Sequence, residues 1–280
     1  MPTNITRFRI HYLRPNATIA IIGRRGSGKS TIVRYLLWGY KYLTGSAYVI
    51  SNTADLNKDY NGMVPDAAIT REYNPEMIKS IFNGQSKIRQ KVDQGNLRDN
   101  IKKMVVIVMD DILSDAKWKN DKYMKMMIND GRHFYFTNIL SVQNPQAINN
   151  KDREAFDYLI ITSASNDNYK KFIYNNYINH DIINNYKQFT NIVSRCTEGY
   201  RAMIIDNKKM STCSNISESI FYLDIKKPEA YKRRVCVSNR FWKIANSYTR
   251  KNWKTQYYNQ LLGIQQTAPS GKKKSSDLII

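Results

Sequence analysis

The sequence predicts an α/β fold of three layers, with a mostly parallel central sheet between two layers of helices. Short apolar runs of strand length recur along the chain, and stretches with a helical period of apolar residues separate them. The runs are apolar throughout and do not alternate with polar residues, as expected of parallel strands buried on both faces. The 280 residues are 42% hydrophobic and 24% charged, so the chain can bury a large core and is not globally disordered.

The expected elements alternate in type along the chain. The run Thr18–Ile22 stops at a glycine, the run Met104–Met109 is the strongest of all, and Asn74-Pro75 opens a helix because proline suits a first turn. We expect strands at 18–22, 47–50, 104–109, 138–142, 158–162 and 200–205, and a polar loop over 52–70. We expect helices at 29–43, from 75 into the polar stretch 85–98, at 123–129 with Gly131 as its C-cap, and around 168–177.

The charge of the chain is unusual. It carries 44 Lys and Arg against 23 Asp and Glu, a net charge of +21 that attracts polyanions such as nucleic acid or an anionic membrane surface. Residues 226–280 hold 13 of the cations and only two acids, Glu229 and Asp277. We therefore divide the chain into a domain at 1–225 and a basic C-terminal extension at 226–280, whose last dozen residues are expected to be flexible.

Cysteine and histidine usage excludes several classes of protein. Cys196, Cys213 and Cys236 are odd in number and far apart, which excludes a disulfide scaffold or a thiolate zinc site and favours a reducing compartment. Three scattered histidines give no support to a histidine-built metal centre. The N-terminus lacks the apolar stretch of a secretory signal, and no run approaches the roughly 18 apolar residues of a membrane helix. We expect a soluble, intracellular protein without a membrane span.

The segment from Gly23 to Ser30 reads Gly-Arg-Arg-Gly-Ser-Gly-Lys-Ser and matches the phosphate-loop pattern G-x-x-x-x-G-K-[ST] in full, between an expected strand and an expected helix. Glycines let consecutive amides point at phosphate oxygens, and the helix presents its positive end to the same anion. Lys29 is expected to reach the β- and γ-phosphates of ATP, and the Ser30 hydroxyl to ligate Mg²⁺. The nucleotide-binding residues expected from this motif are Gly23, Arg24, Arg25, Gly26, Ser27, Gly28, Lys29, Ser30 and Thr31.

Two acids follow the strongest strand, about 80 residues after the phosphate loop. Asp110 is expected to hold Mg²⁺, mostly through water, because hard cations prefer oxygen ligands. Asp111 is placed to accept a proton from an attacking water. Together they predict a Walker B element.

Gln143 ends the next apolar strand. In a phosphate-loop sheet of the additional-strand type, this strand lies between the strand that precedes the phosphate loop and the strand that precedes the two acids. A polar side chain at its end then faces the γ-phosphate. We interpret Gln143 as a residue that orients water and senses hydrolysis; the alternative is a polar cap in a loop.

Arg132 and His133 follow the helix after the Walker B acids. An arginine aimed at the nucleotide of a neighbouring subunit can neutralise charge on the transferring phosphoryl group, whereas a lone arginine at a helix end is often a surface charge. Arg71 is the competing candidate for the same role. The chain lacks the Leu-Ser-Gly-Gly-Gln signature of transporter cassettes and the Asn-Lys-x-Asp motif of guanine readers.

These motifs together resemble the DNA-packaging ATPases of nucleocytoplasmic large DNA viruses, of poxvirus and iridovirus type, which belong to the FtsK/HerA superfamily. The resemblance rests on Ile-Ile-Gly-Arg-Arg-Gly-Ser-Gly-Lys-Ser-Thr, Val-Met-Asp-Asp-Ile, Asp-Gly-Arg-His-Phe and Leu-Ser-Val-Gln, within about residues 18–145. The second Walker B acid is commonly glutamate in the wider superfamily, and Asp111 has a shorter reach.

The resemblance implies a RecA-like core and an ATP- and Mg²⁺-dependent ring, hexameric in the family, around double-stranded DNA. It implies that the chain moves a genome into a capsid in the host-cell cytoplasm or the virion, with capsid, portal or membrane proteins as further partners. Family roles fall on Lys29 and Ser30 for phosphate and Mg²⁺, Asp110 for Mg²⁺, Asp111 as base, Gln143 as sensor and Arg132 as the trans arginine.

A motor that moves along any DNA sequence should hold phosphates, since only the backbone repeats at every step. The cations of 226–254 fit that need, and the aromatic residues among them are interpreted as core or interface residues. Two alternatives remain open: a nucleoside or nucleotide kinase, and a nucleotide-binding virion or DNA-binding protein without motor activity. The aromatic residues are Phe241, Trp242, Tyr248, Trp253, Tyr257 and Tyr258.

Overall fold

The computed structural model describes residues 5–53, 58–112, 117–163, 166–212, 215–226, 228–231, 234–247 and 253–263. Within them lies one nine-stranded sheet with the strand order β1-β9-β8-β7-β2-β6-β5-β3-β4. Neighbouring strands are parallel except at β8, which runs antiparallel to β7 and to β9. The mostly parallel α/β sheet expected from the sequence is confirmed. The strands are β1 (Thr6–Arg7), β2 (Thr18–Ile22), β3 (Thr44–Ser51), β4 (Ile69–Thr70), β5 (Met104–Asp110), β6 (Phe136–Val142), β7 (Tyr158–Ile161), β8 (Ala202–Asp206) and β9 (Ile220–Leu223).

The strand β6 lies between β2 and β5 and pairs with both in parallel. This is the additional-strand arrangement, and it is confirmed. All residues of β2, β5 and β6 are buried, which explains why β2 and most of β5 are apolar without alternation, whereas β6 also buries Thr137, Asn138 and Ser141.

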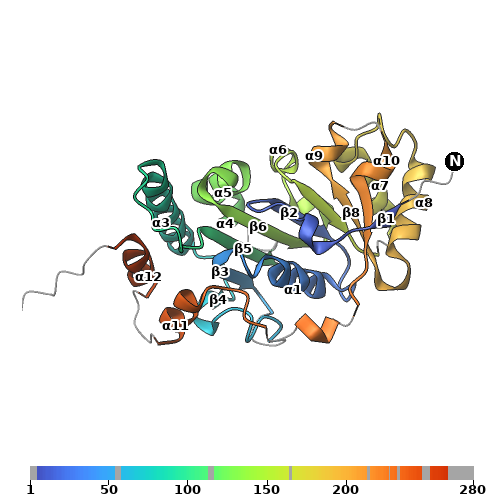
Figure 1. Cartoon of the computed structure of the whole chain (residues 1–280). Coiled ribbons are helices and arrows are strands. Elements are labelled where there is room, and N and C mark those ends of the chain that lie inside the picture. Colours follow the sequence, from blue (N-terminus) through green and yellow to red (C-terminus); the bar gives the residue numbers. More distant parts are fainter. Residues whose placement is uncertain are drawn as a thin grey trace, which may run out of the picture.

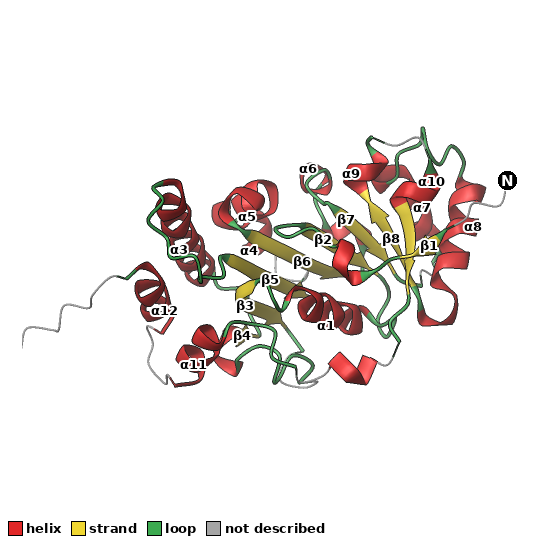
Figure 2. Ribbon diagram, in the orientation of Figure 1, coloured by secondary structure: helices red, strands yellow, loops and turns green. Residues whose placement is uncertain are grey.

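Helices cover both faces of the sheet (Figure 1, Figure 2). The helix α1 follows β2 on one face, while α3 and α5 lie on the other, as right-handed crossovers between parallel strands require. The larger helices are α1 (Lys29–Tyr40), α3 (Pro75–Asp93), α5 (Lys122–Asp130), α7 (Asp167–Tyr177), α8 (Tyr186–Thr197), α11 (Asn239–Ser247) and α12 (Trp253–Leu262). The short ones are α4 (Lys117–Asn120), α6 (Asn150–Arg153), α9 (Asn207–Met210) and α10 (Ile216–Ser219).

The expected helix that begins at Pro75 is α3, and it ends at Asp93. Asn74 caps it, since its side chain accepts a hydrogen bond from the amide of Met77. It stops at Asp93 because the next amides, of Gly95 and Asn96, donate back to the carbonyls of Val92 and Lys91. The helix therefore runs into the polar stretch 85–98, as predicted, and ends within it.

Gly131 follows α5 as expected, but it does not close the helix in the left-handed conformation typical of a glycine cap. Its φ is −54°, and it begins a 3-10 turn over Gly131–Phe134; the left-handed residue is Tyr135, with φ 63°. The strand predicted at 200–205 is β8, but it is not the last one. Both β9 and the edge strand β1 extend the sheet beyond it, and their shortness hid them from the sequence pattern.

The residues after β9 return to the opposite edge of the sheet. Ser238 donates a hydrogen bond to the carbonyl of Gly45 in β3, at 2.7 Å, in the part of β3 that the short strand β4 leaves unpaired. Phe241 is fully buried, with its ring 5.5 Å from that of Tyr48 and 5.0 Å from that of Tyr257. The helix α12 packs on α3, where Tyr258 lies against Gly84.

The aromatic residues of this C-terminal segment therefore belong to the core where they are described: Phe241, Tyr257 and Tyr258 are buried and Trp242 is partly buried. Tyr248, the side chain of Trp253 and the tail 269–280 lie outside the described residues, so the flexible tail stays a prediction, as does the division at residue 225.

Candidate nucleotide site

The topology brings the motifs together at one edge of the sheet. The strands β2, β5 and β6 are parallel neighbours, so the residues that follow their carboxyl ends meet there. The amide of Gly23 donates to the carbonyl of Val142, at 3.1 Å, and the amide of Asp111 donates to that of Ser141, at 3.2 Å. The phosphate loop, the two acids and Gln143 thus share one site, as the sequence predicted.

The phosphate loop turns directly into a helix. Gly28 stands before α1 with φ 88°, a left-handed conformation that glycine adopts without strain. The helix then begins at Lys29, so its unpaired amides point toward the loop. Arg24 and Arg25 are exposed, while the Ser27 hydroxyl donates to the Arg24 carbonyl at 2.7 Å. The loop therefore has the form that binds an anion.

The Lys29 side chain lies within the loop. Its ammonium donates to the carbonyls of Gly23, at 2.9 Å, and Arg24, at 3.0 Å, and the residue is only 8% exposed. Burial lowers the pKa of Lys29, and the nearby charges of Asp111 and Asp110 oppose that shift. A phosphate offered to this ammonium would replace neutral carbonyl partners with charged ones.

One carboxylate oxygen of Asp110 accepts hydrogen bonds from two hydroxyl groups. The Ser30 hydroxyl donates to its Oδ2 at 3.1 Å, and the Tyr60 hydroxyl donates to the same oxygen at 2.5 Å. Burial, and next the negative charge of Asp110, raise the pKa of Tyr60 well above its ordinary value, so this phenol stays protonated. The Arg34–Asp59 ion pair, at 2.6 Å, joins α1 to the residue before Tyr60.

Asp111 and Gln143 form a pair. The side-chain amide of Gln143 donates to both carboxylate oxygens of Asp111, each at 2.7 Å. The backbone of Asp111 has φ 57°, a left-handed conformation that is uncommon for aspartate and often marks functional sites. Both residues are partly exposed, so a ligand at the loop can reach them.

The donors present fit a nucleotide with a hard cation. A serine hydroxyl and a carboxylate that already touch, next to an anion-binding loop, are the oxygen ligands that Mg²⁺ takes in such sites. The Thr31 hydroxyl accepts a hydrogen bond from Arg34, at 3.1 Å, and its contact with a nucleotide stays a prediction.

Two residues of the site escaped the sequence analysis. Tyr60 lies in the loop between β3 and β4, which no motif marks. Thr162 follows β7, and its hydroxyl is 2.7 Å from that of Ser27. Its position at the end of an apolar strand, as for Gln143, is the signal that could have identified it.

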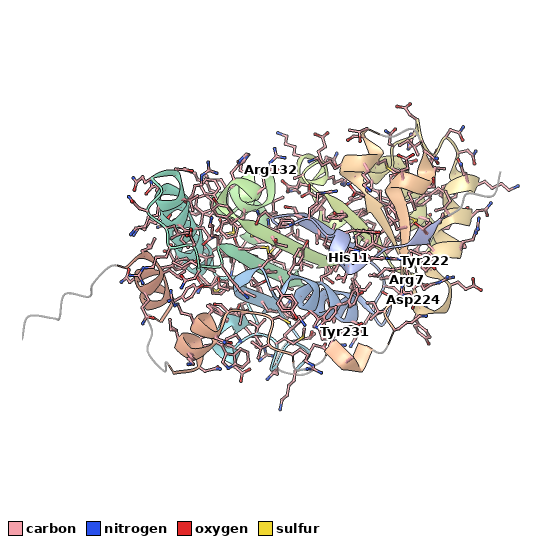
Figure 3. The ribbon with its side chains drawn as sticks, in the orientation of Figure 1. Arg7, His11, Arg132, Tyr222, Asp224 and Tyr231 are labelled. Atoms are coloured by element: carbon pink, nitrogen blue, oxygen red, sulfur yellow. The ribbon has the colours of Figure 1, made fainter. Side chains whose placement is uncertain are left out.

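The two arginine candidates lie at opposite ends of the parallel strands, one at the amino ends and the other at the carboxyl ends. Arg132 precedes β6 by four residues, so it lies at the amino end of that strand, where it lines a cavity of about 920 Å³. Gln143 follows the other end of the same seven-residue strand, about 20 Å or more away at the usual rise per residue. Arg71 follows β4, which pairs with the carboxyl end of β3, and is therefore at the edge that carries the phosphate loop. Figure 3 shows Arg132 well apart from the labelled residues around Arg7.

Arg132 is thus too far to serve the phosphate loop of its own chain, and its role in trans stays a prediction, as does that of Arg71. Among the described helices, none combines the length and the apolar character needed to cross a membrane.

The profile of the Poxvirus A32 protein family matches residues 6–226. The uncharacterized protein L437 of Acanthamoeba polyphaga mimivirus is 30% identical over 223 residues, which cover 78% of this chain and 76% of the relative. The uncharacterized protein 015R of Frog virus 3 (isolate Goorha) is 28% identical over 256 residues, 88% of this chain and 76% of the relative. The uncharacterized protein 075L of Invertebrate iridescent virus 6 is 32% identical over 189 residues, 68% and 70% of the two chains.

Solved structures share the fold. The genome packaging NTPase B204 from Sulfolobus turreted icosahedral virus 2, in complex with ATP-gammaS, superposes with a TM-score of 0.52 at 16% identity, over 75% of this chain and 98% of B204. The pCW3 conjugation coupling protein TcpA, with ATPgS, gives 0.53 at 13% identity, over 83% of this chain and 64% of TcpA. At such identities these similarities establish the P-loop NTPase fold and no more.

Proposed function

The chain belongs to the Poxvirus A32 protein family, as its motifs indicated, and from this premise we propose that it is an ATPase motor that moves double-stranded DNA to package a viral genome. One observation carries the proposal. At the mouth of a complete phosphate loop, the Gln143 amide holds both oxygens of Asp111, next to the Asp110–Ser30 contact. This arrangement suits hydrolysis, because a carboxylate and an amide lie together beside the phosphate loop.

Each residue has a defined task. The bound nucleotide supplies the phosphoanhydride bond, and Mg²⁺ supplies charge neutralisation between the phosphates. With nucleotide bound, the Lys29 ammonium, which contacts the carbonyls of Gly23 and Arg24 here, would contact phosphate oxygens, and Ser30 and Asp110 would hold the cation. Asp111 accepts a proton from the attacking water once Gln143 releases one of its oxygens. The Asp111–Gln143 pair is therefore the resting state, and its opening prepares the base.

Duplex DNA as the substrate is supported by charge and by similarity. The chain has a net charge of +21, and B204, which shares its fold, is described as a genome packaging NTPase. In a ring of subunits, Arg132, which lies far from the phosphate loop of its own chain, would act on the nucleotide of a neighbouring subunit.

The test of hydrolysis uses purified full-length protein with ATP and Mg²⁺, with and without long duplex DNA. We expect turnover that rises with DNA and falls with salt. Lys29→Ala should abolish turnover and weaken nucleotide binding. Asp111→Asn should keep binding and lower turnover by about 10²–10⁴-fold, the usual contribution of a general base. Asp93→Asn, at an exposed ion pair on α3, is the matched control and should leave turnover unchanged.

Three results would contradict the proposal. Phosphate transfer to an added nucleoside would favour a kinase, and nucleotide binding without turnover would favour a non-hydrolysing protein. Normal turnover of Asp111→Asn would remove this residue as the base. For the ring, mixing Arg132→Ala with Lys29→Ala subunits should restore part of the activity at mixed interfaces, and no recovery would leave Arg71 as the candidate.

A further inference from the structure

The N-terminal residues 6–14, here called the strap, cross the sheet from the edge strand β1 to the start of β2. Their side chains alternate in environment over the first part of this path. Phe8 is 3% exposed and its ring lies 6.0 Å from that of Tyr158, whereas the flanking Arg7 and Arg9 are exposed. Further along, Leu13 is buried, while His11 and Tyr12 are exposed. The strap therefore has an apolar inner side and a cationic outer side.

The strap is firmly held. Arg14 makes two hydrogen bonds to Asp206, at 2.7 and 2.9 Å, and its guanidinium stacks over the Tyr158 ring at 4.5 Å. The hydroxyl of Tyr158 donates to the Tyr12 carbonyl at 3.1 Å, and that of Tyr40 donates to the Arg14 carbonyl at 2.8 Å. The outward cations are thus displayed on a fixed backbone, which lowers the entropy cost of binding.

A groove of about 620 Å³ is lined by residues 6–12 of the strap and by Tyr35 of α1. None of its lining residues is acidic, and Arg7, Arg9 and His11 are among them. The larger cavity near Arg132 differs, because Glu154 and Asp157 stand among its cations. The absence of acids continues along the sequence: the first 54 residues contain eight Lys and Arg and no Asp or Glu. The residues that line the groove are therefore cationic, and the acid that stands beside them is Asp224, whose charge acts on Tyr35.

The geometry of the two arginines suits a repeating polyanion. Arg7 and Arg9 lie two residues apart in extended backbone, so their side chains leave the same face about 6–7 Å from each other. Arg7 donates one hydrogen bond to the Asp224 carbonyl, at 2.8 Å, and Arg9 makes no ion pair with any described residue. Figure 3 shows Arg7 and His11 near Tyr222 and Asp224 at this place.

We propose that the strap groove is a contact surface for the phosphate backbone of duplex DNA, with Arg7 and Arg9 as its principal cations. The choice of DNA among polyanions rests on the proposed function. The surface lacks a base-reading role in this proposal, because charge repeated along an extended segment recognises phosphates of any sequence. The strap also touches the helix of the phosphate loop: Ile10 lies so close to Gly39 of α1 that a Cβ added there would be 2.4 Å from Ile10 Cγ1.

The experiment measures binding of a labelled random-sequence duplex by fluorescence anisotropy, from about 50 to about 200 mM salt. The variants are Arg7→Ala/Arg9→Ala and Arg9→Ala alone, which keeps every described hydrogen bond of the strap. Each lost phosphate contact should reduce the slope of log affinity against log salt by about 0.9, so by nearly 2 for the double variant. Arg7→Lys/Arg9→Lys should keep the slope, because the charge remains.

The matched control is Lys122→Ala/Lys125→Ala, which removes two exposed cations from α5, far from β1 in Figure 1. It should change the slope little. A wild-type slope in both alanine variants of the strap would overturn the inference, and so would an equal loss in the α5 control. If the alanine variants of the strap lose binding to phosphatidylserine vesicles but keep their binding to DNA, the inference is also overturned, in favour of a membrane surface.

The outcome separates this inference from the proposed function. If DNA stimulates ATP turnover equally in the wild type and the strap variants, the proposed motor function stands and the DNA contact of the strap is refuted. A protein without turnover whose strap variants lose DNA binding would refute the motor and keep the strap.

Discussion

The hydrogen bond from Tyr60 to Asp110 gives a sharp test of how the site is held together. Tyr60→Phe removes only the hydroxyl, and both partners are buried, at 1% and 4% exposure. A hydrogen bond to a charged group contributes about 1.5–3 kcal/mol, whereas one to a neutral group contributes about 0.5–1.5 kcal/mol. Tyr40→Phe is the matched control, because Tyr40 is 2% exposed and donates to a neutral carbonyl, that of Arg14, at 2.8 Å. We therefore expect Tyr60→Phe to lower the free energy of unfolding about twice as much as Tyr40→Phe.

The assay is urea unfolding of the two variants without nucleotide, followed by circular dichroism, with the slope of the transition checked for equality. A double-mutant cycle with Asp110→Asn isolates the interaction, since the charged acceptor becomes neutral. The coupling should be about 1 kcal/mol or more. If Tyr60→Phe destabilises no more than Tyr40→Phe, or if the cycle shows no coupling, the hydroxyl does not hold the Asp110 carboxylate and the reasoning fails.

Other outcomes can be checked in the same way. Phe241→Ala should lower the free energy of unfolding by about 3–5 kcal/mol in urea melts, because the ring is fully buried; a loss below about 1 kcal/mol would mean that α11 is not part of the core. Gly23→Ala should abolish binding of a fluorescent ATP analogue, since its Cβ would lie 1.6 Å from the Thr162 hydroxyl, and adding Thr162→Ala should restore part of the binding; no recovery would contradict the steric cause. Burial raises the pKa of Cys196 to about 11 and of Cys236 to about 12, from an ordinary value of 9.0. The unfolded chain then loses these protons first, so the free energy of unfolding should fall from pH 9 to pH 11, and less steeply in a Cys196→Ala/Cys236→Ala variant; equal slopes would contradict this.

Local sequence determined the central strands, the phosphate loop and the chemistry of its acids. A strand buried on both faces is mostly apolar, so β2, β5 and the apolar part of β6 could be found from their residue types. The loop from Gly23 to Ser30 could be found because contiguous residues carry its function. The order of β2, β6 and β5 followed from the additional-strand pattern, and with it the meeting of Asp111 and Gln143.

Tertiary structure alone decided the contacts between segments distant in sequence. Tyr60 and Asp110 are 50 residues apart, and the loop that carries Tyr60 has no periodic pattern to place it. The alternation of Arg7, Phe8 and Arg9 could be interpreted only from the fold, which buries Phe8 in the core and leaves the two arginines exposed. The C-terminal helices illustrate the same limit: their charge predicted an extension, whereas burial of Phe241 against Tyr48 joins them to the sheet edge that β4 leaves open. Composition specifies what a segment can bury, but the surface that receives it is built by the rest of the chain.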